Sequence, residues 1–199
     1  MPITAVLLAG GESRRMGRDK ATLVWRGCPL WEWQIGKLRK LQPKKILLSA
    51  KSDPRWRPAN IDIVLDAAPS RGPLSGLAAA LDCIETDHLL ALGIDMPFMT
   101  TEHLKDLCNR ATKEMGVIPT LDGRPEPVAA IYPRTAREEF SAALRGIDFS
   151  LKSLVEKLIR SGLLESFEIA ASDRGLYKSI NEPRDLADFA ERGGSTKSQ

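Results

Sequence analysis

The sequence predicts a single α/β domain with a Rossmann-like, open and mostly parallel β-sheet and helices on both faces of that sheet. Short apolar runs alternate along the chain with segments of helical periodicity. This alternation is typical of a parallel sheet that is covered on both sides. The length of 199 residues suits one domain. We place that domain at residues 1–192 and expect a disordered tail at 193–199.

The strands are expected at the apolar runs. Ile3–Leu8 and His88–Ile94 are almost wholly apolar, as strands that are buried on both faces tend to be. The other expected strands are Lys45–Ala50, Ile61–Leu65, Gly116–Thr120, Val128–Tyr132, Phe167–Ala170 and Tyr177–Ile180. A tight turn is expected at Asp122–Gly123, before the strand that begins at Val128.

The helices are expected between these strands. Pro73–Ile84 has the clearest pattern, because proline opens the segment and apolar residues follow at positions 74, 77, 78 and 81. The remaining helices are expected at Leu30–Leu41, Glu102–Ala111, Arg137–Leu144, Leu151–Ile159 and Pro183–Ala190.

The composition excludes several kinds of site and partner. The three cysteines are widely spaced and form no C-x-x-C pair, and the only histidines are His88 and His103. A disulfide framework and a zinc site are therefore not expected, and a cytoplasmic location fits. Any metal ion should be a hard cation bound through oxygen. No apolar run reaches the roughly 20 residues that a membrane span requires, so no membrane association is expected.

Positive charge is concentrated in the first part of the chain. Residues 1–60 have a balance of +9, whereas the remainder has a balance of −6. Such a basic segment indicates an anionic ligand. Cations gather in the loop after the first strand rather than along a helix, and no aromatic stacking platform accompanies them, so a small phosphorylated ligand is favoured over a nucleic acid.

The glycine-rich and arginine-rich loop after the first strand has the composition of a phosphate-binding turn. Gly10 and Gly11 let backbone amides approach an anion closely. Arg14, Arg15 and Lys20 place cationic groups beside them. The loop matches neither G-x-x-x-x-G-K-[ST] nor G-x-G-x-x-G. The alternative is an ordinary glycine turn with solvated basic residues, and the position directly after a buried strand favours phosphate binding.

Further candidate residues follow other strands, and ligands of open α/β sheets bind at the carboxyl ends of strands. Asp95 could hold Mg²⁺ against a triphosphate or could simply be a turn residue. Asp66 could recognise a base or a sugar, or close a turn. Gly72 and Gly76, at the start of the helix at 73–84, leave room for a ligand or mark an ordinary helix start. Asn181 has the position of a helix N-cap.

In these motifs the chain resembles the molybdenum cofactor guanylyltransferases of the MobA-like NTP transferase superfamily. The resemblance extends over residues 4–190. It is carried, in order, by Leu8-Ala9-Gly10-Gly11, Ser13-Arg14-Arg15-Met16-Gly17, Asp19-Lys20-Ala21, Gly72-Pro73-Leu74-Ser75-Gly76, Asp95-Met96-Pro97-Phe98 and Ile180-Asn181-Glu182-Pro183.

The resemblance implies a magnesium-dependent nucleotidyltransferase that moves GMP from GTP to the terminal phosphate of molybdopterin and releases pyrophosphate. The residues implied are Leu8, Ala9 and Gly10 at the nucleotide, Lys20 at its phosphates, Asp66 in nucleotide recognition, Asp95 at GTP and Mg²⁺, and Asn181 as a second magnesium ligand. Catalysis would consist of positioning and charge neutralisation by Lys20 and Asp95 with Arg14 or Arg15. Transient contacts with cofactor-insertion proteins or molybdoenzymes are expected.

Two alternatives stay open at this point. One is a related transferase that uses CTP, or that uses GTP with another phosphorylated acceptor. The Gly10-Gly11 pair resembles the GTP-using branch, but Lys51 stands near a family position usually held by an asparagine that contacts the nucleotide. The other alternative is a nucleotide-binding regulator without turnover, against which the presence of both Lys20 and Asp95 argues.

Overall fold

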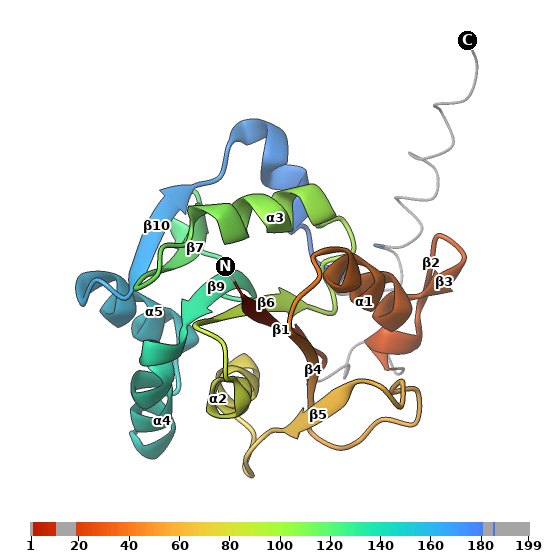
Figure 1. Ribbon diagram of the computed structural model, residues 1–199, viewed down its shortest axis with the longest axis horizontal. Helices are drawn as coiled ribbons and strands as arrows, with labels where there is room; N and C mark the ends of the chain where they lie inside the picture. Colours follow the sequence, from red (N-terminus) through yellow and green to blue (C-terminus); the bar gives the residue numbers. More distant parts are fainter. Residues whose placement is uncertain (1, 11–18, 181–184, 186–199) are drawn as a thin grey trace.

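An open β-sheet forms the centre of the computed structural model, which describes residues 2–10, 19–180 and 185 (Figure 1). Side by side, the strands are β10 (Leu164–Glu168), β7 (Gly116–Leu121), β9 (Ala129–Pro133), β6 (His88–Gly93), β1 (Ile3–Leu8), β4 (Lys45–Ala50) and β5 (Asp62–Leu65). Neighbouring strands from β6 to β5 pair in parallel, as do β7 and β10, whereas β9 is antiparallel to β6 and β7. The mostly parallel sheet that the sequence predicts is confirmed.

Helices cover both faces of this sheet (Figure 1). The helical segments are α1 (Leu30–Lys40), α2 (Pro73–Cys83), α3 (Thr101–Arg110), α4 (Arg137–Arg145), α5 (Leu151–Arg160) and the 3-10 turns η1 (Lys20–Thr22), η2 (Arg134–Ala136) and η3 (Ala171–Tyr177). Helices α1 and α3 lie on one face, and α2, α4 and α5 lie on the other. No helix in the described part of the chain is long and apolar enough to cross a membrane.

The continuous apolar run of β1 is explained by two hydrophobic cores. Ile3, Ala5 and Leu7 pack in the core on the α1 and α3 side. Val6 and Leu8 pack in the core on the α2, α4 and α5 side. Because successive side chains of a strand point to opposite faces, a central strand between two helical layers is mostly apolar on both of its faces. The buried Thr4 is the polar exception, and its hydroxyl is hydrogen-bonded to that of Thr86 at 2.9 Å.

Two small antiparallel features accompany the sheet. The expected turn at Asp122–Gly123 has two residues of positive φ, 51° and 70°, and joins β7 to the short β8 (Arg124–Pro125). A second hairpin, β2 (Val24–Trp25) with β3 (Cys28–Pro29), was not predicted. Its two-residue strands are too short to show an alternating pattern, and Gly27 was its only turn signal.

The prediction of a strand at Tyr177–Ile180 is wrong. Tyr177 ends η3 instead, and its ring packs edge-to-face against His103 with a centroid distance of 5.4 Å. The Tyr177 hydroxyl also lies 2.7 Å from Nε2 of His103. Ile180 donates its amide proton to the carbonyl of Asp95 at 2.8 Å. The apolar residues of this segment therefore reflect packing onto α3 and the loop after β6.

The last expected elements differ in another way. The strand expected at Phe167–Ala170 is β10, which begins earlier, at Leu164. Because Glu165 and Ser166 are polar and exposed, the first part of β10 contains no apolar run that would predict a strand. The helix expected at Pro183–Ala190 and the tail at 193–199 concern residues that, apart from position 185, the structure does not describe.

Acid should destabilise this fold through His88, which is fully buried at the start of β6. Burial lowers the pKa of its imidazole, and the backbone at Met115 and Thr112 offsets this only in part. The unfolded chain then binds a proton more readily than the folded protein, so the stability that neutral His88 contributes above the unfolded pKa of about 6.5 is lost as the pH falls.

When the pH is lowered from about 7.5 to about 5, the free energy of unfolding should decrease less in His88→Leu than in the wild type. Urea denaturation at each pH measures this difference. Part of the pH dependence should remain, because burial also lowers the pKa of His103. Identical pH profiles for the two proteins would contradict the assignment to His88.

Candidate active site

The carboxyl ends of β1, β4 and β6 meet at one edge of the sheet and border a pocket of about 140 Å³. The register of the sheet brings them level, since Leu8 pairs with Ser49 on β4 and with Gly93 on β6. The residues that line the pocket are Leu8, Ala9, Gly10, Asp19, Lys20, Ser49, Asp66, Gly72, Pro73, Gly93, Ile94, Asp95, Val128 and Ser179. Most of the described residues that the sequence singled out are therefore neighbours in space.

Lys20 and Asp95 face each other in this pocket. Nζ of Lys20 lies 3.5 Å from Oδ2 of Asp95, and the two side chains are 16% and 27% exposed. Lys20 comes from η1, the turn after the glycine-rich loop, and Asp95 comes from the turn after β6. A cation and a carboxylate that are both open to solvent can contact one triphosphate together.

The turn that carries Lys20 is held by Asp19. Its Oδ1 accepts a hydrogen bond from the Ala21 amide at 3.0 Å, and its Oδ2 accepts one from Nε1 of Trp56 at 2.7 Å. The Trp56 ring in turn stacks on Trp31, with centroids 5.8 Å apart. This stacked pair therefore supports the Asp19 side chain that begins the turn. The position of Asp19 as an N-cap was the sequence signal that could have identified it.

The carboxylate of Asp95 folds back over Gly93. A Cβ atom on Gly93 would lie 2.9 Å from Oδ1 of Asp95, so a larger residue at this position would displace the carboxylate. The backbone around it is tied to neighbouring segments, since Ile94 donates its amide proton to the carbonyl of Leu8 at 3.0 Å. The local fold thus fixes the direction in which Asp95 points.

Asp66, which directly follows β5, is one of the aspartates that line the pocket, with Asp19 and Asp95. Its Oδ1 accepts a hydrogen bond from the Ser49 hydroxyl at 3.3 Å, and its Oδ2 accepts one from the Ser70 hydroxyl at 2.6 Å. Gly10 lies against it, because a Cβ atom there would be 3.1 Å from Oδ2. The sequence reasoning missed both serines, although Ser49 is a polar residue in an otherwise apolar strand end.

The two glycines near α2 have different surroundings. Gly72 lines the pocket and is the N-cap of α2 with a φ of 64°, a conformation that glycine adopts without strain. Gly76 faces the side chains of Ser49 and Leu8, and a Cβ atom would collide with the Ser49 hydroxyl. The absence of a side chain at Gly76 therefore lets α2 pack against Leu8 of β1 and Ser49 of β4. This is the alternative of an ordinary helix start rather than of a ligand-binding glycine.

Four predicted site residues lie outside the described residues: Gly11, Arg14, Arg15 and Asn181. Their roles stay predictions. Within the described part of the chain, no cluster of three or more His, Cys, Asp or Glu side chains could hold a metal ion by itself. The chemistry of Asp95 still fits Mg²⁺, because this ion commonly binds to one or two carboxylates and takes its other ligands from substrate phosphates and water.

Comparison with known protein families gives a match over most of the chain. The profile of the MobA-like NTP transferase domain matches residues 5–175. A relative from Opitutus terrae named "Probable molybdenum cofactor guanylyltransferase" is 32% identical over 187 residues, which cover 92% of each chain. A relative of the same name from Mycobacterium tuberculosis H37Rv is 32% identical over 163 residues, which cover 78% of this chain and 80% of the relative.

Solved structures agree with this match. Molybdopterin-guanine dinucleotide biosynthesis protein A from Archaeoglobus fulgidus superposes with a TM-score of 0.73 at 25% identity, over 96% of this chain and 98% of that protein. The 2-C-methyl-D-erythritol 4-phosphate cytidylyltransferase from Thermus thermophilus has a TM-score of 0.71 at 19% identity, over 97% and 99% of the two chains, and shares the fold alone. The chain therefore belongs to the MobA-like NTP transferase family, as its motifs predicted.

Proposed function

We propose that the protein transfers GMP from GTP to the terminal phosphate of molybdopterin, with Mg²⁺, and so forms molybdopterin guanine dinucleotide and pyrophosphate. The observation that carries the proposal is the 3.5 Å approach of Lys20 to Asp95 at one pocket between strand ends. Relatives at 32% identity that bear the name molybdenum cofactor guanylyltransferase support the choice of nucleotide and acceptor.

The acceptor phosphate in this reaction is a nucleophile without the help of a catalytic base. A phosphate monoester has a second pKa near 6, so at neutral pH it is mostly a dianion. One of its oxygens attacks the α-phosphorus of GTP, the bond between the α-phosphorus and the bridging oxygen breaks, and pyrophosphate leaves with that electron pair. No proton has to be removed from the dianion, so the protein has to position two anions and neutralise their charge.

The residues of the pocket position the two anions and neutralise their charge. Lys20 stabilises the negative charge that moves onto pyrophosphate, and Asp95 holds Mg²⁺. When bound, the ion neutralises triphosphate charge and orients its oxygens. Asp66, kept in place by Ser49 and Ser70, accepts hydrogen bonds from the hydroxyl or amino groups of the nucleoside. Arg14 and Arg15 are expected to add cationic contacts to the phosphates.

The test is to incubate the protein with Mg²⁺, molybdopterin and GTP, CTP or ATP in parallel, and to detect the dinucleotide by mass spectrometry. We expect the guanine dinucleotide and an equal amount of pyrophosphate with GTP alone among the three. A cytosine product would make the protein a CTP-using relative. Nucleotide binding without pyrophosphate release, with molybdopterin supplied, would make it a regulator, and either result would overturn the proposal.

We infer that this reaction takes place in the cytoplasm. Cys28, Cys83 and Cys108 are free thiols, which fits a reducing compartment. The product is a cofactor that has to reach another protein. Transient contacts with cofactor-insertion proteins or molybdoenzymes are therefore expected.

A further inference from the structure

Helix α1 directs two buried polar side chains at the turn that carries Asp95 (residues 93–97, here called the Asp95 turn). Gln34 is completely buried, and Lys37, one helical turn further on, is 8% exposed. Buried polar groups persist only where they find hydrogen-bond partners. Both of these side chains find them in the Asp95 turn.

Gln34 binds both ends of the tightest part of this turn. Its Nε2 donates to the carbonyl of Gly93 at 2.9 Å and to the carbonyl of Met96 at 3.0 Å. Its Oε1 accepts a hydrogen bond from Nζ of Lys37 at 2.7 Å. Only one orientation of the amide places the NH₂ group at two acceptors and the oxygen at a donor, so the side chain has a defined direction.

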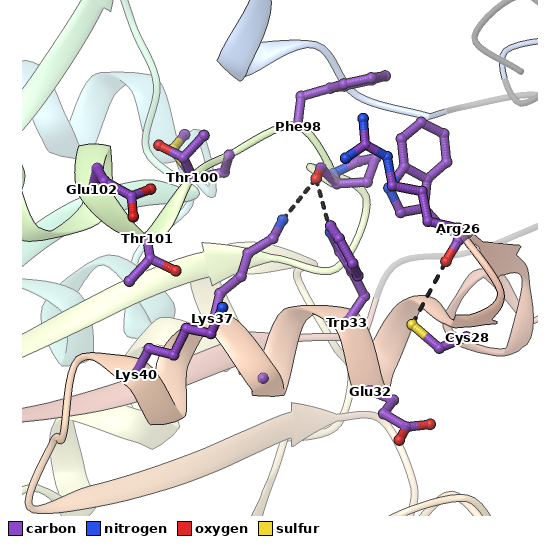
Figure 2. A pocket seen from close by; sticks show the side chains of 14 residues that line it. Arg26, Cys28, Glu32, Trp33, Lys37, Lys40, Phe98, Thr100, Thr101 and Glu102 are labelled. Carbon is purple, nitrogen blue, oxygen red and sulfur yellow. Dashed lines mark hydrogen bonds between the residues drawn. The ribbon is translucent and has the colours of Figure 1, made fainter. Parts of the chain in front are cut away.

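Lys37 extends the network by one residue. Its Nζ donates to the carbonyl of Pro97 at 2.7 Å, and Nε1 of Trp33 donates to the same oxygen at 3.0 Å. Figure 2 shows the Lys37 and Trp33 side chains converging from α1 on that oxygen. A charged ammonium has three N–H donors and a neutral amine has two, so Lys37 can satisfy both of its acceptors in either state.

The three carbonyls of this network flank Asp95 on both sides in the sequence. Gly93 precedes it by two residues and contacts its carboxylate, whereas Met96 and Pro97 follow it directly. Side chains of α1 therefore fix the backbone on each side of the residue that faces Lys20. A small rotation of the Gly93 peptide would move the surface on which the Asp95 carboxylate rests.

Stability alone gives little reason for Lys37. Burial and, to a smaller extent, the charge of Arg26 together lower the pKa of its ammonium to about 7. At and below neutral pH the charged group is therefore less favourable in the folded protein than in the unfolded chain. Burying a charged group costs free energy that its hydrogen bonds have to offset, which suggests that Lys37 has a role in the geometry of the turn.

We propose that Gln34 and Lys37 are positioning residues that hold the Asp95 carboxylate in the direction required for the metal-bound triphosphate. This inference rests on the role proposed above for Asp95. The expected signature is a loss of turnover and of divalent-metal affinity that is not matched by a loss of stability, because neither side chain reaches the pocket between the strand ends.

The test uses Lys37→Met and Gln34→Met, which keep the length of each side chain and remove its donors. Substitutions behind a metal ligand typically reduce metal affinity or activity by about 10- to 100-fold, and we expect reductions of this size in kcat and in the affinity of the GTP-bound protein for Mn²⁺, followed by electron paramagnetic resonance. The KM for GTP should change little, and so should the thermal unfolding midpoint of Lys37→Met, because Trp33 still donates to the Pro97 carbonyl.

Two further variants separate positioning from charge. Lys40→Met removes an exposed cation from the same helix and the same cavity, a hollow of about 500 Å³ between α1 and the segment that leads into α3 (Figure 2). It should behave as the wild type. Lys37→Arg retains a cationic donor and has room beside this cavity, so it should recover most of the activity that Lys37→Met loses.

Wild-type kcat and Mn²⁺ affinity in a folded Lys37→Met protein would overturn the inference, as would an equal loss in Lys40→Met. If turnover falls only in proportion to the fraction of folded protein, the network stabilises the fold and does not position Asp95, which would also overturn the inference. Lys37→Met retains the Trp33 contact to Pro97, which keeps a folded variant available if Gln34→Met does not fold. Absence of turnover in the wild type would refute the proposed function, while the Mn²⁺ titration would still test the positioning role.

Discussion

Asp95→Ala and Lys20→Ala are each expected to reduce turnover by about 100- to 1000-fold, the usual effect of removing one preorganised charge-stabilising group. Asp95→Ala removes the carboxylate that fits Mg²⁺, and Lys20→Ala removes the cation 3.5 Å from it. Because both groups would act on the same triphosphate, the double variant should lose less than the product of the two single losses. Pyrophosphate release at saturating GTP and molybdopterin measures the effect.

The controls for this prediction concern folding and charge. Both side chains are partly exposed, so the thermal midpoints of the variants should stay near that of the wild type. Lys45 and Asp62 form another lysine–aspartate pair. They lie at the first residues of β4 and β5, at the ends of these strands that point away from the pocket, and Asp62→Ala should keep full turnover. Wild-type activity in either Asp95→Ala or Lys20→Ala would remove that residue from the mechanism.

Gly116→Ala is expected to destabilise the protein by about 3 kcal/mol, at the upper end of the range for overpacked cores. Gly116 opens β7 and lies between β9 and β10. A Cβ atom there would collide with the carbonyl of Ile131 and would lie 2.7 Å from Cδ of Pro133 and 2.8 Å from Cδ2 of Leu164. The Ile131 oxygen belongs to a strand backbone, which cannot move aside as a side chain can.

Equilibrium urea unfolding of Gly116→Ala measures this effect, and Gly36→Ala is the matched control. Gly36 lies inside α1, and among the described residues no atom beyond its own stretch of the helix is within 4 Å of the place where its Cβ would be. Alanine is a better helix former, so this variant should gain about 0.5 to 1 kcal/mol. Equal midpoints for Gly116→Ala and the wild type would show that β7 and β9 can separate to admit a methyl group.

The fold was largely accessible from the sequence because its central strands carry strong signals. β1 is apolar at every position except Thr4, since it packs in two cores, and α2 has an apolar stripe with proline at its start. The errors fell where packing and periodicity diverge. Tyr177 and Ile180 are buried by loop contacts rather than by strand pairing, and β10 has exposed polar residues at the edge of the sheet.

The candidate site was accessible only in part, for a related reason. Lys20, Asp66 and Asp95 stand next to strand ends or glycine motifs, which a linear reading can recognise. The supporting residues, such as Ser70, Gln34 and Trp33, act through hydrogen bonds that span up to 64 positions along the chain. Their chemistry is ordinary for a loop or a helix, and only the folded arrangement shows which groups they hold.

The reversed direction of β9 brings residues from the later half of the chain to the pocket. Because β9 runs against β6, the loop that enters it opens onto the same edge as the ends of β1 and β6. Val128 and Ser179 line the pocket there, beside Gly93 and Asp95. Most of the candidate groups of this pocket thus come from positions 8–95, and Val128 and Ser179 complete its lining from the later half of the chain. Substitutions at these two positions can therefore reshape the pocket while Lys20, Asp66 and Asp95 stay in place.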